Sequence, residues 1–207
     1  LLAKTAATLD VLSRGRLGLG VRTGWQKEEF GALGLDFDRR RALLNDTIAA
    51  CRALWSESPA RFSSPSVSFE KIWCEPRPVQ PGGVPIWFSG TLTRRNLERI
   101  TRLGDGWIPI MGETPEGLER GVAQLRDAWR AHGRDPDGLK VRGSLDVVRS
   151  DDGRPSLRRT LAAAPELARR GATDVQIPLL AFVRAPERLP DFFPELAAAW
   201  TEVKRGP

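Results

Sequence analysis

The sequence predicts an α/β fold built around a parallel sheet, and three observations support this prediction. Short, nearly all-apolar runs such as VPIWF at Val84–Phe88 are typical of strands that are buried on both faces. Long amphipathic helical patterns separate these runs, as right-handed crossovers between parallel strands require. Glycine stops and Asp or Thr-Pro starts mark the ends of the helices. Doubly wound sheets and closed barrels share this alternation, so periodicity alone leaves both architectures open.

The first half of the chain contains two predicted helices, one strand and an excursion. Leu1–Leu12 has leucine and alanine at helical spacing but no N-cap residue ahead of it. Arg16–Val21, with the sequence RLGLGV, predicts a short strand that leads into glycine-rich backbone. A helix follows over Asp38–Trp55, and Asp36 or Asp38 can cap its start. Arg61–Pro81 is rich in Ser and Pro and predicts a loose hairpin rather than a linker between domains.

The second half of the chain repeats a strand followed by a helix. The strands are predicted at Val84–Phe88, Gly106–Ile110, Leu139–Val148 and Val175–Leu180. The helices are predicted at Thr93–Leu103, Thr114–His132, Leu157–Gly171 and Pro186–Arg205. Leu157–Gly171 is taken as one helix, closed by its glycine, although Pro165 lies near its middle.

The composition is that of a globular domain and argues against disorder. The chain has 207 residues, of which 41% are hydrophobic, and its 7 Trp and 8 Phe supply large apolar side chains. No apolar run approaches the roughly 18 residues of a membrane span, and Leu1–Leu12 lacks the features of a signal peptide. Cys51 and Cys74 are too few for a disulfide framework or a zinc site, so a cytoplasmic location fits best.

The net charge of +6 raises the question of a nucleic-acid partner. Only five of the 32 basic residues are lysine, and arginine is scattered through every segment of the chain. Nucleic-acid binders usually cluster their basic residues on one face and interleave aromatic side chains. We therefore expect neither a nucleic-acid nor a membrane partner.

Four phrases of the sequence occur together in one order. They are LAKTAATLDVLSRGRLGLGV, the GW-x-x-EEF-x-x-LG-x-DF run at Trp25–Phe37, CEPRPVQPGGVPIWFSG and ITRLGDGWIPI. Together they resemble the luciferase-like monooxygenase superfamily, most closely its branch that uses the deazaflavin coenzyme F420. The resemblance covers nearly the whole chain, whereas no single phrase would suffice.

The resemblance implies a partial (β/α)8 TIM barrel. Arg16–Val21 corresponds to the fourth strand of the family barrel, and the strands that begin at Val84, Gly106, Leu139 and Val175 correspond to the fifth to eighth. We therefore expect Arg16–Val21 and the Val84 strand to be parallel neighbours.

The first three strands of the family barrel have no counterpart in this sequence. The missing start signal of the Leu1–Leu12 helix agrees with this. Residues 1–207 are expected to form one N-terminally truncated barrel domain. The sequence is then truncated or incompletely predicted, or another chain supplies the missing part.

The turn between the Val84 strand and the next helix is the first candidate site, because the chemistry of such barrels lies at the C-terminal ends of the strands. Ser89, Gly90 and Thr91 precede a helix start, which aims backbone N–H groups and a partial positive charge at one point and so suits a phosphate. Thr91 and Thr93 add hydroxyl donors. Arg94 and Arg95 follow and add positive charge.

An ordinary tight turn with Thr93 as the N-cap is the alternative for this segment. The resemblance implies that the turn holds the cofactor phosphate. The family carries Gly-Gly here, whereas this chain has Ser89–Gly90.

The loop Gly20–Trp25 is the second candidate site. By the resemblance, glycine is frequent here because a flat cofactor ring approaches the backbone, and Gly24 and Trp25 are the candidate ring contacts. Trp25 is alternatively a core or lid aromatic. Arg22 stands where the family usually has glycine, and its side chain either fills the ring site or turns outward to pair with the polar cofactor tail.

Three further residues are assigned structural roles. Asp105 is expected to shape the loop before Trp107, His132 to cap the end of a helix, and Cys51 to be a small buried hydrophobe. No arrangement of His, Asp, Ser or metal ligands appears, so no catalytic residue and no metal site are assigned.

With a completed barrel, the resemblance implies hydride transfer between coenzyme F420 and an organic small-molecule substrate. The cofactor would carry the redox chemistry, and the protein would supply orientation, electrostatics and exclusion of water. An FMN-dependent monooxygenase of the same superfamily is the alternative. A third interpretation is not an enzyme but a cofactor-free, degraded paralogue that acts as a non-enzymatic partner, or a half-barrel that pairs with a partner. A homodimer is among the expected partners of the chain.

Overall fold

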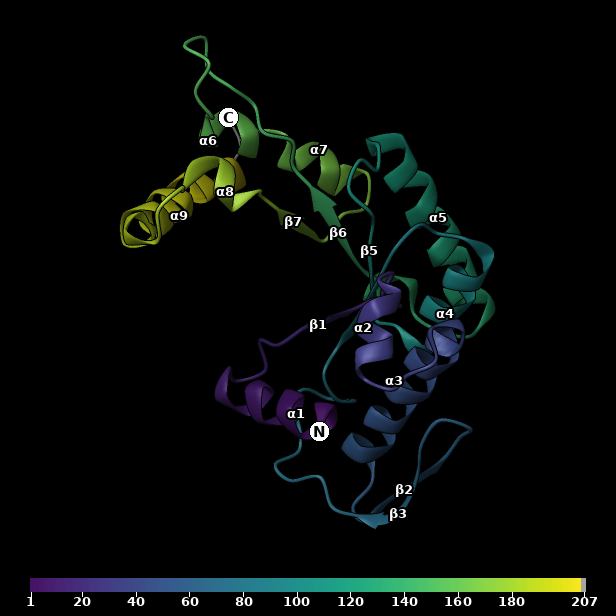
Figure 1. Cartoon of the computed structure of the whole chain (residues 1–207). Coiled ribbons are helices and arrows are strands. Elements are labelled where there is room, and N and C mark those ends of the chain that lie inside the picture. Colours follow the sequence, from purple (N-terminus) through teal and green to yellow (C-terminus); the bar gives the residue numbers. More distant parts are fainter. Residues whose placement is uncertain (206–207) are drawn as a thin grey trace.

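A five-stranded parallel sheet organises the molecule, and its strands follow one another in chain order (Figure 1). The computed structural model describes residues 1–205. The strands are β1 (Leu19–Val21), β4 (Ile86–Ser89), β5 (Gly106–Ile108), β6 (Lys140–Ser144) and β7 (Asp174–Gln176). In the described part of the chain, β1 and β7 are the edge strands. Val21 of β1 lies opposite Phe88 of β4 in parallel register, so the predicted pairing of these two segments is confirmed.

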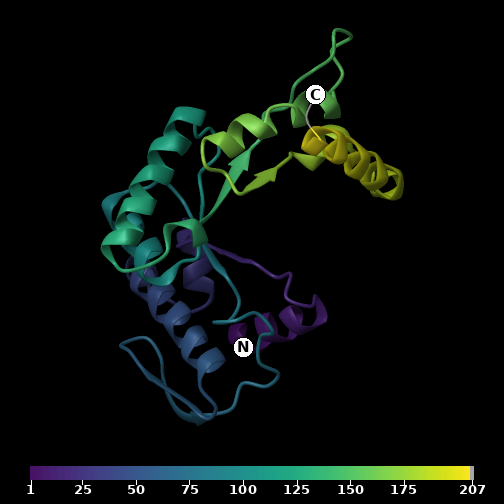
Figure 2. The ribbon, with the colours of Figure 1, turned by 180° about the vertical axis from the view of Figure 1, so that it is seen from behind.

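The helices form an outer layer around a curved sheet. Helices α3, α4 and α5 follow one another along one side of the strands, whereas α1 and α9 lie at the two ends of an arc (Figures 1 and 2). The α-helices are α1 (Leu2–Leu12), α2 (Lys27–Ala32), α3 (Arg40–Ser56), α4 (Arg94–Leu103), α5 (Pro115–Ala131), α6 (Leu157–Leu161), α7 (Ala164–Arg169), α8 (Leu179–Phe182) and α9 (Leu189–Arg205). Short 3-10 turns are η1 (Phe37–Arg39), η2 (Pro136–Gly138) and η3 (Pro186–Arg188). No helix described in the structure is both long and apolar enough to cross a membrane.

The excursion after α3 is the predicted hairpin. Strands β2 (Ala60–Ser63) and β3 (Ser68–Ile72) pair antiparallel and form a separate two-stranded sheet. The hairpin lies beyond the C-terminal end of α3, apart from the parallel sheet (Figure 1).

Alternation along β4 and β5 separates the two faces of the parallel sheet. Phe88 and Trp107 are 1% exposed and belong to the main hydrophobic cluster, with Trp107 against Gly121 of α5. Trp87 and Ile108 lie on the opposite, inner face, where glycine on neighbouring strands makes room for them. A Cβ atom at Gly106 would lie 2.8 Å from the Trp87 ring. The glycine-rich character of the strands therefore has a packing cause.

Asp105 connects the N-terminal ends of three strands. Its backbone N–H donates to the Ile86 carbonyl (2.7 Å), and its Oδ2 accepts from the Ile86 N–H (2.8 Å). Its carbonyl accepts from the Lys140 N–H (3.0 Å). Its carboxylate also accepts from the Arg52 guanidinium (2.7 Å) and lies 3.6 Å from that of Arg134. The predicted role of shaping a loop is thus part of a larger one, which is to set the register of β4, β5 and β6.

Two arginines also cap the C-terminal end of α4. Arg52 donates to the Leu103 carbonyl (2.9 Å), and Arg134 donates to the carbonyls of Thr101 and Gly104 (2.8 Å each). Cations are favourable at this end of a helix, where carbonyl groups lack intrahelical partners.

The predicted single helix Leu157–Gly171 is wrong. Helix α6 ends at Leu161, and α7 begins at Ala164 with Pro165 in its first turn. Proline has no N–H and clashes with the carbonyl four residues earlier, so it is tolerated only near a helix start. The chain therefore breaks into two short helices.

All five strands of the parallel sheet are shorter than predicted, and two of the predicted segments leave the sheet well before their predicted ends. The segment Leu139–Val148 stays in the sheet only to Ser144, and beyond it the N–H of Val148 donates to the Thr160 hydroxyl of α6. The segment Val175–Leu180 leaves the sheet after Gln176 and turns into α8. Helix α2, within the loop after β1, was not predicted.

We predict that Asp105→Ala lowers the free energy of unfolding by about 2 kcal/mol, because the Ile86 N–H and the two guanidinium groups lose a charged acceptor. The value is discounted because the Asp105 side chain is 30% exposed. Urea denaturation followed by circular dichroism measures the change. Asp127→Ala is the control, since its exposed pair with Arg130 should change stability by no more than about 0.5 kcal/mol. Equal losses in both variants would contradict the role of Asp105.

We predict that Gly121→Ala destabilises the fold by about 1–3 kcal/mol through overpacking. A Cβ atom at Gly121 would lie 2.5 Å from the Trp107 ring, which is buried and has no room to move. Gly31→Ala in α2 is the matched control, because a Cβ atom there meets nothing within 4 Å. Replacement of a helical glycine at such a site should be neutral or stabilise by about 0.5 kcal/mol. Thermal unfolding of the two variants distinguishes these outcomes.

Candidate functional site

A cavity of about 510 Å³ lies where β1 and β4 end and where α4 begins. It brings together both predicted loops, because Thr23 follows β1 and Ser89 ends β4, and these two strands are parallel neighbours. The predicted residues Ser89, Gly90, Thr91 and Thr93 all line it. Gly24 and Trp25 are not among its lining residues.

The wall of this cavity is strongly cationic. Its arginines are Arg22, Arg41, Arg94, Arg95 and Arg99, and its lining contains no acidic residue. Arg94 pairs with Glu98 of the next turn (3.1 Å), but this pair is exposed. The other four arginines have no carboxylate within 4 Å among residues 1–205. An unbalanced positive wall of this kind attracts an anion.

Arg99 is held in one orientation by neutral amides. Its Nε donates to Asn45 Oδ1 of α3 (2.7 Å), and its Nη1 donates to Asn96 Oδ1 (3.1 Å). Asn96 in turn donates to the Thr91 carbonyl (3.2 Å), so the guanidinium is connected to the turn that ends β4. Burial lowers the pKa of Arg99, and the nearby charge of Arg41 adds a smaller effect in the same direction. Its charge is thus positioned without a counter-ion.

The turn Ser89–Thr93 only partly matches the predicted cluster of free amides. The Gly90 N–H donates to the Ile108 carbonyl (3.0 Å), and the Thr93 N–H donates to the Thr91 carbonyl (2.8 Å). The prediction that these two amides point at a ligand is therefore wrong, since both are used within the protein. Arg94 and Arg95 begin α4, where N–H groups have no acceptor inside the helix.

Thr93 is the N-cap of α4, as the alternative reading of the turn predicted. Its hydroxyl oxygen accepts from the Asn96 N–H at 3.3 Å. Its hydroxyl proton remains available to a ligand. Gly90 has a φ of +131°, a conformation that residues with a Cβ atom rarely adopt, and Trp107 Nε1 donates to its carbonyl at 2.9 Å. The glycine is thus required by the shape of the turn.

Gly24 and Trp25 lie on the loop beside this cavity. Gly24 has a φ of +73°, and a Cβ atom there would lie 2.9 Å from the Phe30 ring. Its need for glycine is explained by the turn and by Phe30. Trp25 is 71% exposed, so its reading as a core aromatic is wrong, whereas a ring contact or a lid remains a prediction.

Sequence reasoning missed the contribution of α3 to the site. Arg41 and Asn45 come from this helix, and they face Arg95 and Arg99 of α4. Arg41 and Asn45 are four residues apart, as are Arg95 and Arg99, so each pair lies on one face of its helix. That spacing could have indicated a polar face on each helix. Only the packing of α3 against α4, which the sequence does not give, brings the two faces together.

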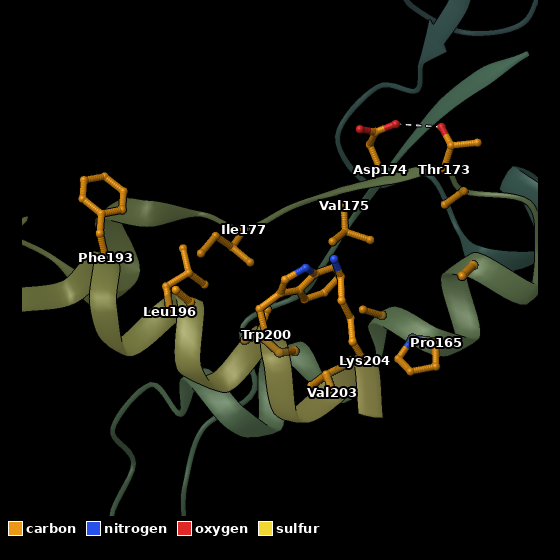
Figure 3. A pocket seen from close by; sticks show the side chains of 15 residues that line it. Pro165, Thr173, Asp174, Val175, Ile177, Phe193, Leu196, Trp200, Val203 and Lys204 are labelled. Carbon is orange, nitrogen blue, oxygen red and sulfur yellow. Dashed lines mark hydrogen bonds between the residues drawn. The ribbon is translucent and has the colours of Figure 1, made fainter. Parts of the chain in front are cut away.

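A larger cavity, of about 850 Å³, lies elsewhere (Figure 3). It runs along β7 between α7 and α9, and Val175, Ile177, Leu196 and Trp200 form apolar walls. Of its polar groups, Thr173 and Asp174 bond to each other (2.7 Å), and the Lys204 side chain lies beside the Trp200 ring. An apolar groove beside a strand edge suits packing of protein side chains better than binding of an anion.

Cys51 and His132 have the structural roles that the sequence predicted for them. Burial raises the pKa of the Cys51 thiol to about 11, which is the behaviour of an inert buried side chain. His132 is the C-cap of α5, with its Nδ1 2.9 Å from the Ala128 carbonyl oxygen. Among residues 1–205, no group of His, Cys, Asp and Glu could hold a metal ion.

The sequence of this chain is similar to those of several known bacterial proteins. An uncharacterised protein of Mycobacterium tuberculosis is 39% identical over 146 residues, which are 70% of this chain and 50% of that protein. An FMNH2-dependent dimethylsulfone monooxygenase of Pseudomonas fluorescens is 30% identical over 129 residues, which are 61% of this chain and 34% of that protein.

Solved structures share the fold. An F420-dependent secondary alcohol dehydrogenase, solved with an F420-acetone adduct, superposes with a TM-score of 0.72 at 16% sequence identity. The superposition covers 96% of this chain and 74% of that structure.

The chain spans about half the length, or less, of the curated relatives that it matches. The profile described as luciferase-like monooxygenase matches residues 1–188. This match covers most of the chain and agrees with the parallel α/β fold and with the solved structures that share it. The chain belongs to the luciferase-like monooxygenase family.

Proposed function

We propose that this chain is the part of a luciferase-like oxidoreductase that contributes strands four to eight of its barrel, and that it binds the phosphate of coenzyme F420. The observation that carries the proposal is the arginine-lined cavity at the C-terminal ends of β1 and β4. An anionic cofactor fits this donor set, because four of its arginines lack a carboxylate partner among residues 1–205. The solved F420-dependent alcohol dehydrogenase, which shares the fold, supports this choice of cofactor.

The residues of the chain would divide the work of binding. The first turn of α4, with the hydroxyl groups of Thr91 and Thr93, would hold the phosphate. Arg22 lines the same cavity and would pair with the polar part of the cofactor rather than fill the ring site. Gly24 and Trp25 would lie against the ring, with Trp25 excluding water from it. When bound, the cofactor supplies the hydride that is exchanged with the organic substrate.

An FMN-dependent monooxygenase is the second candidate function. The Pseudomonas fluorescens relative, at 30% identity, acts with FMNH2 and supports it. A phosphate monoester carries about −1.5 to −2 charges, so FMN would satisfy the same cationic cavity. The two candidates thus share the phosphate site and differ in the ring that is bound.

The remaining parts of the proposal concern partners and location. We propose a small-molecule substrate, a cytoplasmic location and no nucleic-acid or membrane partner. The apolar groove along β7 would pack against protein, either the remaining barrel strands or a second copy of the chain. Size-exclusion chromatography distinguishes a monomer from a homodimer.

Titration of the purified protein with F420 and with FMN, followed by cofactor fluorescence, tests the cofactor proposal. We predict saturable binding of F420 that is at least about tenfold tighter than binding of FMN, a ratio equivalent to about 1.4 kcal/mol. Arg95→Gln should weaken F420 binding by about tenfold or more, because a charge-assisted hydrogen bond contributes about 1.5–3 kcal/mol. Arg158→Gln is the control, since that exposed arginine pairs with Glu202 outside the cavity.

Each result of the titration favours one reading. Tighter binding of FMN would transfer the assignment to the monooxygenase. Binding of neither cofactor would overturn the enzyme proposal and favour a cofactor-free paralogue.

A further inference from the structure

The positive charge of the site extends beyond the phosphate cavity. A second cavity, of about 530 Å³, lies between α3 and α4, and the two cavities share Arg41, Arg95 and Arg99. The second cavity adds Arg102 from the last turn of α4. The shared arginines therefore form a continuous cationic wall that leads from the end of β4 into the groove between the two helices.

The acidic groups of this groove only partly balance the wall. Asp46 and Glu98 line the second cavity. Glu98 is already paired with Arg94 at 3.1 Å, which leaves Asp46 as the remaining carboxylate of the lining. Within residues 1–205, Asp46 forms no salt bridge with any of the four arginines that line this cavity.

A single phosphate cannot neutralise this wall. A phosphate monoester brings about −2 charges at most, and a phosphodiester brings about −1. The phosphate cavity alone has five arginines in its lining, one of which is paired with Glu98. At least two positive charges would then remain next to the bound phosphate without an anion.

Arg41 and Arg99 are the arginines best placed for a second anion. They come from different helices, and they are close enough for the charge of Arg41 to disfavour that of Arg99. Such repulsion costs stability in the free protein and is relieved when an anion lies between the two groups. Asn45 and Asn96 hold Arg99 by two of its donor groups, so its remaining N–H groups have a fixed direction.

We infer that Arg41 and Arg99 form a second anion subsite, and that the ligand of this chain is a small molecule with a phosphate and at least one further anionic group. The phosphate would bind at the turn that ends β4, and the second group, a carboxylate or another phosphate, would bind in the groove between α3 and α4. The inference rests on the phosphate site of the proposed function. It adds a determinant of ligand choice that involves residues of α3.

Three small probes test the subsite without the cofactor. Isothermal titration calorimetry measures the binding of inorganic phosphate, of pyrophosphate and of phosphoglycolate, which carries one phosphate and one carboxylate. We expect pyrophosphate or phosphoglycolate to bind at least about tenfold tighter than phosphate, as one additional charge-assisted contact gives. The stronger of the two identifies the second group as a phosphate or as a carboxylate.

Two variants test whether Arg41 and Arg99 bind the second anionic group of the probes. Arg41→Gln and Arg99→Gln should each remove most of the advantage of the stronger probe, and should weaken the binding of phosphate, whose cavity they also line, to a smaller extent. Arg41 is exposed and has no assigned role in packing, so it remains informative even where Arg99→Gln disturbs the fold. Arg158→Gln, in an exposed pair on another face, should leave all three affinities unchanged.

Equal binding of all three probes, or equal loss of all three affinities in Arg41→Gln, would overturn the subsite. This result is distinguishable from a failure of the proposed function. Absence of F420 and FMN binding with an intact preference among the probes would reject the cofactors but retain the subsite. Cofactor binding that is unchanged by Arg41→Gln, with no preference among the probes, would reject only the subsite.

Discussion

The fold and the site both depend on the pairing of Asp105 with Ile86. The Asp105 N–H donates to the Ile86 carbonyl at 2.7 Å, and the Ile86 N–H donates to the Asp105 carboxylate at 2.8 Å. Because side chains alternate along a strand, a shift of one residue would exchange the two faces of β4. Phe88 would then leave the core and Trp87 would enter it. The Asp105 carboxylate, at the N-terminal ends of the strands, therefore helps to determine which residues reach the C-terminal ends.

The core of the sheet extends directly to the proposed site at the C-terminal ends of the strands. Trp107 packs against Gly121 on the helical side, and its Nε1 holds the Gly90 carbonyl at 2.9 Å. Asn96 then links the turn to Arg99, at 3.2 and 3.1 Å. A contiguous path of packing and hydrogen bonds thus connects the interior of the sheet with the cationic wall. Rigid support of this kind keeps a charged side chain in place before any ligand arrives.

The parallel sheet and its helices could be predicted because each strand–helix unit carries its own local signals. Apolar runs, a Thr-Pro start and glycine stops specify elements without knowledge of the rest of the fold. The break between α6 and α7 was not predicted, because the helical pattern of apolar residues continues across Pro165 although proline is not tolerated in a helix interior. The candidate site could be predicted in part, since Ser89 ends β4 and Thr93 caps the start of α4. Arg41 was not found, because its place at the site depends on how α3 packs against α4.

The exposure of Trp25 has a consequence for how the protein can be observed. Trp55, Trp107 and Trp129 are at most 5% exposed, whereas Trp25 is 71% and Trp73 is 57% exposed. Indole emission shifts to longer wavelength in water, so the native fluorescence spectrum should combine a shielded and a hydrated population. A soluble quencher such as iodide reaches only the hydrated rings. Trp73 directly follows the hairpin, whereas Trp25 lies on the loop after β1. The unmodified chain therefore contains its own optical reporter of events at the C-terminal ends of the strands.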